Sequence, residues 1–420
     1  MNPALGNKAR RCCNCVAYAA PRVNASREGT RMASNTSRVV TAAMASALLM
    51  PAAALAQVPE GAALPTAEEH TTTTLPEASP HWAYIVDPVF PHLVATKVWI
   101  VDGDALDVVG MVNGGYLANA AIAPDNGEFY VAETYWSRGT RGERADMVTT
   151  YDARTLEPTG EVLLPEGRFL VVSKKYMAAI TPDGRHVLSY NMAPATSVSV
   201  VDVENQSYVA DIEIPGCALV YPMGPTRFAS ICADGSFITV DFADAQNPGI
   251  QRGEPWFDAE EDPVFEHPGF SQKQGQAYFV TYGGMVYPVD FTGEQPQVGE
   301  AWSLLSDDEQ GAWWPGGWQL ASYHPGSNRL FVQMHEGDRW SHKDAGSEIW
   351  VFDVAAQERV QRIELVQPAW SSMVTQDDQP LLFVLDGGGT TSVYDATTYE
   401  HKGDVAETGI APHLVVVTGE

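Results

Sequence analysis

The sequence predicts an all-β protein, a seven-bladed β-propeller that spans residues 81–420. Three observations support this prediction. A short β-rich run that ends in aspartate recurs seven times, at intervals of 39 to 63 residues. Turn signals such as Asp183-Gly184 separate neighbouring apolar runs, as in β-hairpins. Hydrophobic residues make up 45% of the 420, which is enough for a large core. A repeat of about 40–50 residues with several short strands is typical of a propeller blade, because four-stranded sheets bury their faces by stacking radially.

Each recurring run ends in an aspartate that we interpret as a turn former. The seven are Asp102, Asp152, Asp202, Asp241, Asp290, Asp353 and Asp395. We expect their carboxylates to accept hydrogen bonds from nearby backbone N–H groups, and we assign none of them a catalytic role. We expect the ring to close by pairing of residues 81–86 with Val415–Val417.

The N-terminal segment differs in composition from the rest. Residues 39–55 are almost wholly Ala, Leu, Val and Met, and the run closes on Ala54-Leu55-Ala56, a small-x-small cleavage pattern. We therefore predict that residues 1–56 are a leader or signal peptide and that the mature chain begins at Gln57. A membrane anchor is the alternative, although the run is short and contains Pro51. The start codon is open between Met1 and Met32, and residues 57–80 are expected to form an exposed arm.

The charge balance restricts the partners of the chain. It carries 25 Lys and Arg against 53 Asp and Glu, a formal net charge of -28. Without residues 1–56, 18 basic and 52 acidic residues remain. Nucleic acid and an anionic membrane surface are poor partners for such a chain, because phosphate contacts need a basic face.

Two cysteines remain after the leader, Cys217 and Cys232. Paired cysteines in an exported chain usually form a disulfide. Residues 221–225 are expected to form a turn between two strands, so that the cysteines face each other across a hairpin.

Three segments are denser in functional side chains than a scaffold needs. They are residues 112–117 with two glycines and Tyr116, residues 135–146 with three arginines, and residues 313–319 with three tryptophans. Each is either packing between blades or part of a site. His335 and His342 match no common metal-ligand spacing, and we predict no metal site. No Cys-x-x-Cys-His, phosphate loop or Gly-x-Ser-x-Gly motif occurs.

Together these segments resemble one family, the heavy subunits of the quinoprotein amine dehydrogenases for methylamine and aromatic amines. The resemblance is carried by residues 110–117, Ser137-Arg138, residues 141–146, residues 195–202, Cys217, residues 232–235, residues 314–318 and His342-Lys343, in this order. It covers nearly all of the predicted mature chain.

The resemblance implies a periplasmic heterotetramer of two heavy and two light subunits, with a seven-bladed propeller as the heavy chain. It implies that the tryptophan tryptophylquinone cofactor forms from two tryptophans of the small light chain, so that this chain alone binds none. A primary amine would be oxidised there to aldehyde and ammonia, with a light-chain carboxylate as the base. The electrons would pass to a cupredoxin that is amicyanin- or azurin-like. Whether methylamine or an aromatic amine is preferred stays open.

For this chain the resemblance implies a scaffold and a substrate-channel wall, with no catalytic residue. We expect Tyr116, presented by Gly114 and Gly115, to line the channel; family members have a Phe at this position, so the hydroxyl adds a polar group to the gate. Candidate subunit-interface residues are Arg138, Arg141, Arg144, Trp314 and Trp318. The alternative function is a stand-alone periplasmic β-propeller that binds a partner without catalysis. A self-sufficient propeller enzyme is disfavoured, because we find no metal or cofactor constellation.

Overall fold

A computed structural model describes residues 73–419 of the chain. The predicted leader, residues 1–56, and most of the predicted arm, residues 57–80, lie outside the described residues. The described end of the arm is bound to the sheets, because the Leu75 N–H donates to the Arg154 carbonyl oxygen at 2.8 Å.

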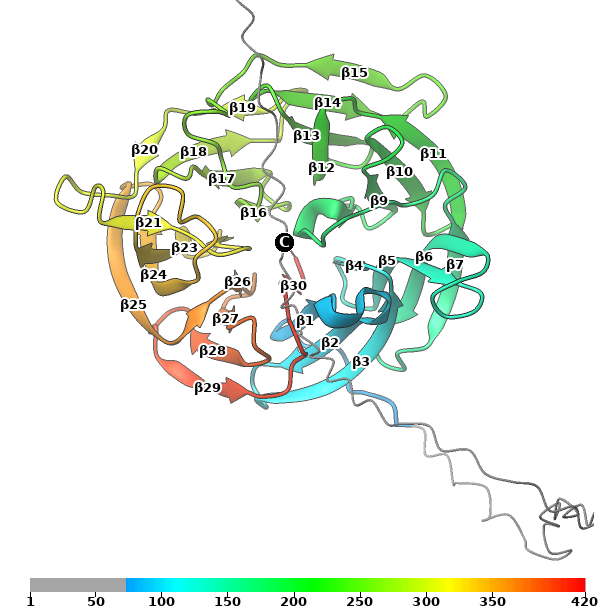
Figure 1. The fold of residues 1–420 in the computed structure, drawn as a ribbon, viewed down its shortest axis with the longest axis horizontal. Coiled ribbons are helices and arrows are strands. Elements are labelled where there is room, and N and C mark those ends of the chain that lie inside the picture. The colour runs from blue at the N-terminus through cyan, green and yellow to red at the C-terminus, as the bar shows by residue number, and fades with distance from the viewer. Residues whose placement is uncertain (1–72, 420) are drawn as a thin grey trace, which may run out of the picture. The chain divides into compact units, whose positions relative to one another are not determined.

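Residues 73–419 form sheets arranged around a common centre (Figure 1), which confirms the predicted all-β propeller class. The eight-stranded sheet contains two four-stranded groups. The first group runs in the order β30 (Leu414–Val417), β1 (Trp82–Asp87), β2 (Thr96–Asp102) and β3 (Asp107–Gly115). The second runs β4 (Asn119–Ile122), β5 (Glu128–Trp136), β6 (Arg144–Asp152) and β7 (Pro158–Leu163). One parallel pair, Gly115 with Thr134, joins the two groups.

Five further sheets complete the described chain. The next two are β8 (Ala178–Ile180), β9 (His186–Asn191), β10 (Ser197–Asp202), β11 (Ser207–Glu213), and β12 (Cys217–Pro222), β13 (Arg227–Cys232), β14 (Phe237–Asp241), β15 (Gly249–Arg252). Then follow β16 (Gly269–Ser271), β17 (Gln276–Val280), β18 (Met285–Asp290) and β19 (Gln297–Val298), with β20 (Trp302–Ser303) also paired to β18. The fifth sheet has β22 (Ala321–His324), β23 (Arg329–Glu336), β24 (Gly346–Asp353) and β25 (Glu358–Ala369), with β21 (Trp313–Pro315) on β23. The last has β26 (Ser371–Val374), β27 (Leu381–Leu385), β28 (Thr391–Asp395) and β29 (His401–Val405). Two short 3-10 helices are η1 (Phe90–Ala95) and η2 (Lys175–Met177).

The number of blades depends on how the eight-stranded sheet is divided. The eight-stranded sheet holds two four-stranded groups. The structure has seven blades only if each of these groups is counted as one blade. The seven-blade count therefore stays a prediction.

Ring closure and the aspartate turns occur as predicted. Strand β1 pairs with β30 in the register Ala83 to Val417 and Tyr84 to Val416. All seven recurring aspartates are the last residue of a strand. Each accepts a hydrogen bond from a backbone N–H two or three residues later, at 2.7 to 3.1 Å. Their conserved position within the repeat is thus explained by turn formation.

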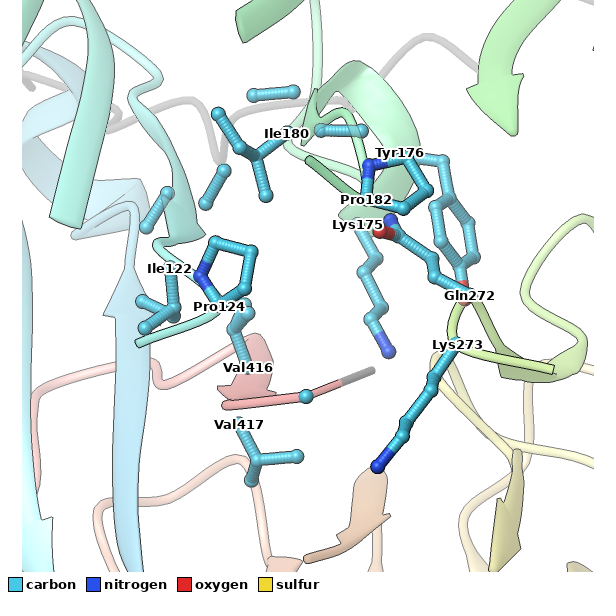
Figure 2. A pocket seen from close by; sticks show the side chains of 15 residues that line it. Ile122, Pro124, Lys175, Tyr176, Ile180, Pro182, Gln272, Lys273, Val416 and Val417 are labelled. Carbon is cyan, nitrogen blue, oxygen red and sulfur yellow. The ribbon is translucent and has the colours of Figure 1, made fainter. Parts of the chain in front are cut away.

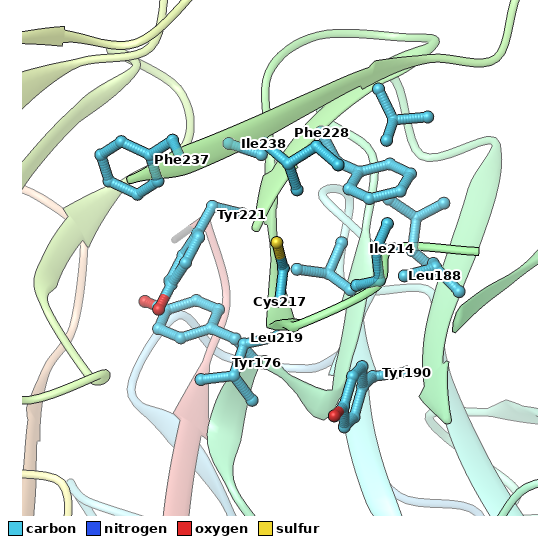
Figure 3. Close-up of a cluster of buried hydrophobic side chains, with 14 of the residues drawn as sticks. Tyr176, Leu188, Tyr190, Ile214, Cys217, Leu219, Tyr221, Phe228, Phe237 and Ile238 are labelled. Carbon is cyan, nitrogen blue, oxygen red and sulfur yellow. The ribbon is translucent and has the colours of Figure 1, made fainter. Parts of the chain in front are cut away.

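The largest buried cluster surrounds the disulfide between Cys217 and Cys232 (Figure 3). The two cysteines are directly opposite each other on β12 and β13, which confirms the predicted hairpin pairing. Tyr221 lies at its centre, with the rings of Phe279 and Phe237 at 5.4 and 6.5 Å. The hairpin is therefore anchored both covalently and by aromatic packing.

Candidate functional site

Every segment selected from the sequence lies on one face of the ring. Within each four-stranded group the neighbouring strands are antiparallel, so the chain crosses a group four times and returns to the same side. One side receives the connections between sheets and those between second and third strands, and we call it the site face. Residues 116–118, 137–143, 304–320 and 337–345 are such connections. The aspartate turns follow the third strands and lie on the opposite face.

Tyr116 is presented by a backbone that requires both preceding glycines. Gly115 has φ +62°, and a Cβ there would lie 2.3 Å from the Thr134 carbonyl oxygen. A Cβ at Gly114 would lie 2.5 Å from the Ala118 Cβ. Glycine is thus needed at both positions for close approach, and at Gly115 also for the left-handed conformation.

The Tyr116 side chain is half-buried and contacts two other segments of its own chain. The edge of its ring meets Trp136 at 5.7 Å between centroids. Its hydroxyl donates to the Leu170 carbonyl oxygen at 3.2 Å. One side of the ring is therefore fixed by β5 and by the connection after β7, while part of it stays accessible.

Arg168 holds the backbone around Tyr116 in place through hydrogen bonds. The sequence analysis did not select this residue. Its side chain is buried, with 1% of the residue exposed. The guanidinium donates to the carbonyl oxygens of Tyr116 and Leu117 and to Asn119 Oδ1. Burial lowers the pKa of Arg168 to about 10, and the carboxylates of Asp146 and Glu133 oppose that shift. The arginine remains charged at neutral pH and holds the backbone that presents Tyr116.

The three arginines of residues 135–146 have different surroundings. Arg144 forms an ion pair with Asp146 at 2.8 Å, and its guanidinium lies 5.5 Å from the centre of the Trp136 ring. It also donates to the Arg168 carbonyl oxygen, so it belongs to the Tyr116 region. Arg138 and Arg141 are exposed, and neither side chain has an ion pair within residues 73–419. They are the cations of this segment that a partner can reach.

Glu133 is a second buried charge that the sequence did not reveal. It is 1% exposed and accepts hydrogen bonds from Thr149 Oγ1 at 2.5 Å and the Tyr135 hydroxyl at 3.1 Å. Burial raises the pKa of Glu133 to about 7, although these hydrogen bonds and Arg168 act in the opposite direction. Its carboxyl group therefore titrates near neutrality.

The tryptophans of residues 313–319 do not act as one cluster. Trp313 packs on Trp350 at 5.2 Å and lies under Arg362, so it seals its own sheet. Trp314 donates through Nε1 to the Gly337 carbonyl oxygen at 2.9 Å. Trp318 points elsewhere and meets Lys343, whose Nζ is 4.6 Å from the ring centre.

The two histidines considered as ligands have ordinary partners. His335 Nε2 lies 2.8 Å from Ser341 Oγ. The His342 ring stacks on Tyr282 at 4.0 Å. Among the residues that the structure describes, no three His, Cys, Asp or Glu side chains are grouped to hold a metal ion.

A cavity of about 480 Å³ lies between the inner strands β4, β8 and β30 (Figure 2). Its described lining is mainly small aliphatic side chains, with Lys175 and Lys273 as cations. The described lining contains no carboxylate and no imidazole.

Large exposed hydrophobic side chains gather on the site face. Phe90, Phe169, Val171, Trp340 and Ile410 all lie in its connections. In residues 73–419 there is no helix long and apolar enough to cross a membrane.

Comparisons with known proteins agree with the resemblance. Residues 80–419 match the family model of the methylamine dehydrogenase heavy chain. The methylamine dehydrogenase heavy chain of Paracoccus versutus is 34% identical over 353 residues, which cover 83% of this chain and 82% of the relative. That of Methylobacillus flagellatus is 31% identical over 333 residues, covering 79% and 83%. A functionally unknown protein from Desulfotomaculum acetoxidans has a similar fold, with a TM-score of 0.54 at 11% identity over 80% of this chain and 99% of that chain. This chain therefore belongs to the methylamine dehydrogenase heavy chain family.

Proposed function

We propose that this chain is the noncatalytic heavy subunit of a periplasmic quinoprotein amine dehydrogenase. The complex oxidises a primary amine with water to an aldehyde and ammonia, releasing two electrons and two protons. A tryptophan tryptophylquinone on the light subunit supplies the electrophilic carbonyl of this chemistry, and a cupredoxin accepts the electrons singly. The family name itself implies a lighter partner chain.

The observation that carries the proposal is the composition of the site face. The segments that resemble the family converge there, although they are distant in sequence. Exposed Phe169 and Val171 lie in the same connection as Leu170, which accepts the Tyr116 hydroxyl hydrogen bond. Exposed apolar side chains beside unpaired arginines are typical of a protein interface with a polar rim.

The surroundings of Tyr116 fit a channel wall. The ring is held on one side by Trp136 and is accessible on the other, as a wall residue must be. Its hydroxyl is engaged by Leu170, so in this chain the added polar group ties two connections together. We therefore propose that Tyr116 shapes the channel chiefly through its ring and does not bind the amine through its hydroxyl.

The proposal is tested by coexpression of this chain with a small, cysteine-rich light subunit encoded nearby. We expect a stable complex of two heavy and two light subunits that reduces an acceptor dye when an amine is added. Arg141→Glu should weaken association, while Lys273→Glu, on the opposite face, should leave it unchanged. If no light subunit copurifies and amines cause no reduction, the chain is instead a stand-alone binding propeller.

A further inference from the structure

A group of cationic and aromatic side chains lies on the site face, apart from the Tyr116 region. We call it the Trp318 cluster, and it consists of Lys174, Trp318, Lys343, Trp370 and His413. The Nζ atoms of Lys174 and Lys343 lie 5.4 and 4.6 Å from the centre of the Trp318 ring. The rings of Trp370 and His413 lie 5.9 and 4.5 Å from it. Five connections that are distant in sequence thus meet here.

The cluster has more positive than negative charge. Lys174 forms an ion pair with Glu266, whereas Lys343 is exposed and has no ion pair within the described residues. Only one of the two ammonium groups therefore has a carboxylate partner among the described residues. Burial, and then the neighbouring Lys343, lower the pKa of Lys174 to about 8. This shift is the expected consequence of a cation that is buried beside a second cation.

Two ring N–H groups in the cluster also have no acceptor among residues 73–419. Trp370 Nε1 donates to His413 Nδ1 at 3.0 Å, so the neutral imidazole carries its hydrogen on Nε2. Burial, followed by the two lysines, lowers the pKa of His413 to about 3, which keeps the ring neutral. His413 is 4% exposed, and its Nε2 has no hydrogen-bond partner; the same holds for the buried Nε1 of Trp318. Both N–H groups are enclosed by the chain itself, so the exposed donor that the cluster offers to an anionic acceptor is the ammonium group of Lys343.

The rim of the cluster indicates a protein as the source of that acceptor. Phe90 is 43% exposed and its ring meets the His413 ring edge-on at 4.9 Å. Ile410, in the connection that leads to His413, is 65% exposed. A small free anion would leave these apolar side chains in water, whereas a docked protein would cover them.

We propose that the Trp318 cluster binds an acidic side chain of the light subunit and so anchors the interface between the two subunits. This inference rests on the proposed function and assigns the residues through which the partner docks. The carboxylate would form an ion pair with the exposed Lys343 beside the Trp318 ring. The rest of this chain is strongly acidic and would repel an acidic region of the partner. The cluster therefore also orients the partner, because its acidic region can approach favourably only at the cluster.

Association of the full heavy chain with its light subunit tests the proposal. Lys343→Met should raise the dissociation constant about tenfold and reduce its dependence on salt, because one ion pair is lost. Lys343→Arg should restore most of the affinity. Lys273→Met is the matched control, since Lys273 is also exposed but lies in the turn between β16 and β17 on the opposite face. Trp318→Phe keeps a ring that attracts the Lys343 ammonium group less strongly, and it should weaken association about threefold.

Chemical accessibility gives a second readout that needs no variant. Reductive methylation of Lys343 should fall at least tenfold in the complex, while that of Lys273 stays the same. If wild-type subunits associate but Lys343 remains equally reactive and Lys343→Met binds as tightly, the anchor is refuted and the proposed function stands. If wild-type subunits do not associate at all, the proposed function itself fails.

Discussion

Replacement of Tyr116 by phenylalanine or alanine separates its packing role from its role in the channel. Tyr116→Phe removes one hydrogen bond, the hydroxyl to the Leu170 carbonyl oxygen at 3.2 Å, and keeps the contact with Trp136. A neutral hydrogen bond contributes about 1 kcal/mol net, so the free energy of unfolding should fall by about that amount. Tyr116→Ala also removes the contact with Trp136 and the buried area of the Tyr116 ring. It should lower the free energy of unfolding by about 2 to 3 kcal/mol.

The two substitutions should also change the selectivity between amines, and their effects on selectivity should differ from each other more than their effects on stability do. A pocket change of this kind is worth about 1 to 3 kcal/mol in discrimination. Tyr116→Ala should therefore shift relative kcat/KM toward bulky aromatic amines by about 5- to 150-fold, because the gate is wider. Tyr116→Phe should shift it by about fivefold or less, because the ring remains and only the tie to Leu170 is lost.

The assay compares kcat/KM for methylamine and for an aromatic amine in the reconstituted complex. Tyr323→Phe is the matched control, since its hydroxyl donates to Asn328 Oδ1 at 3.0 Å on the opposite face. This variant should lose similar stability without a change in selectivity. If both Tyr116 variants lose stability as expected but retain wild-type selectivity, Tyr116 is a packing residue and does not line the channel.

Three further predictions concern buried groups of the same chain. Replacing Cys217 and Cys232 by alanine should cost about 3 kcal/mol of unfolding free energy, because the disulfide closes a loop with a sequence separation of 15; denaturant melts that coincide with wild type would contradict this. Arg168→Met should cost about 3 to 5 kcal/mol, because three acceptors lose a buried charged donor, and a loss below about 1 kcal/mol would show that these hydrogen bonds are dispensable. Burial raises the pKa of Glu133 to about 7 from its ordinary value of 4.5, so the folded state binds the extra proton and the free energy of unfolding should fall as pH rises from 4.5 to 7, by about 3 kcal/mol. Glu133→Gln should remove this slope, and an unchanged difference in melting temperature between pH 5 and pH 8 would refute the assignment.

The repeat and its local turns could be predicted from the sequence because they depend on neighbours along the chain. Each recurring aspartate forms its hydrogen bond with a residue two or three positions later, so its role is visible in a short stretch. The disulfide was predictable for the same reason, since Cys217 and Cys232 lie on adjacent strands of one hairpin. The pairing of β1 with β30 was predictable because a propeller ring must close. This prediction used only the apolar runs at the two ends of the propeller sequence.

The site, by contrast, was decided by how the sheets are placed around the ring. Trp318 stands close to Trp314 in the sequence, yet its partners are Lys174 and Lys343, which belong to other connections. The Lys174-Lys175 pair was a signal that the sequence offered, because cations are scarce in this chain. Radial stacking brings distant connections together on one face, and no local pattern encodes which ones meet. For that reason the sequence by itself determined the repeating fold and the family, while only the tertiary structure showed which buried and cationic side chains form the site face.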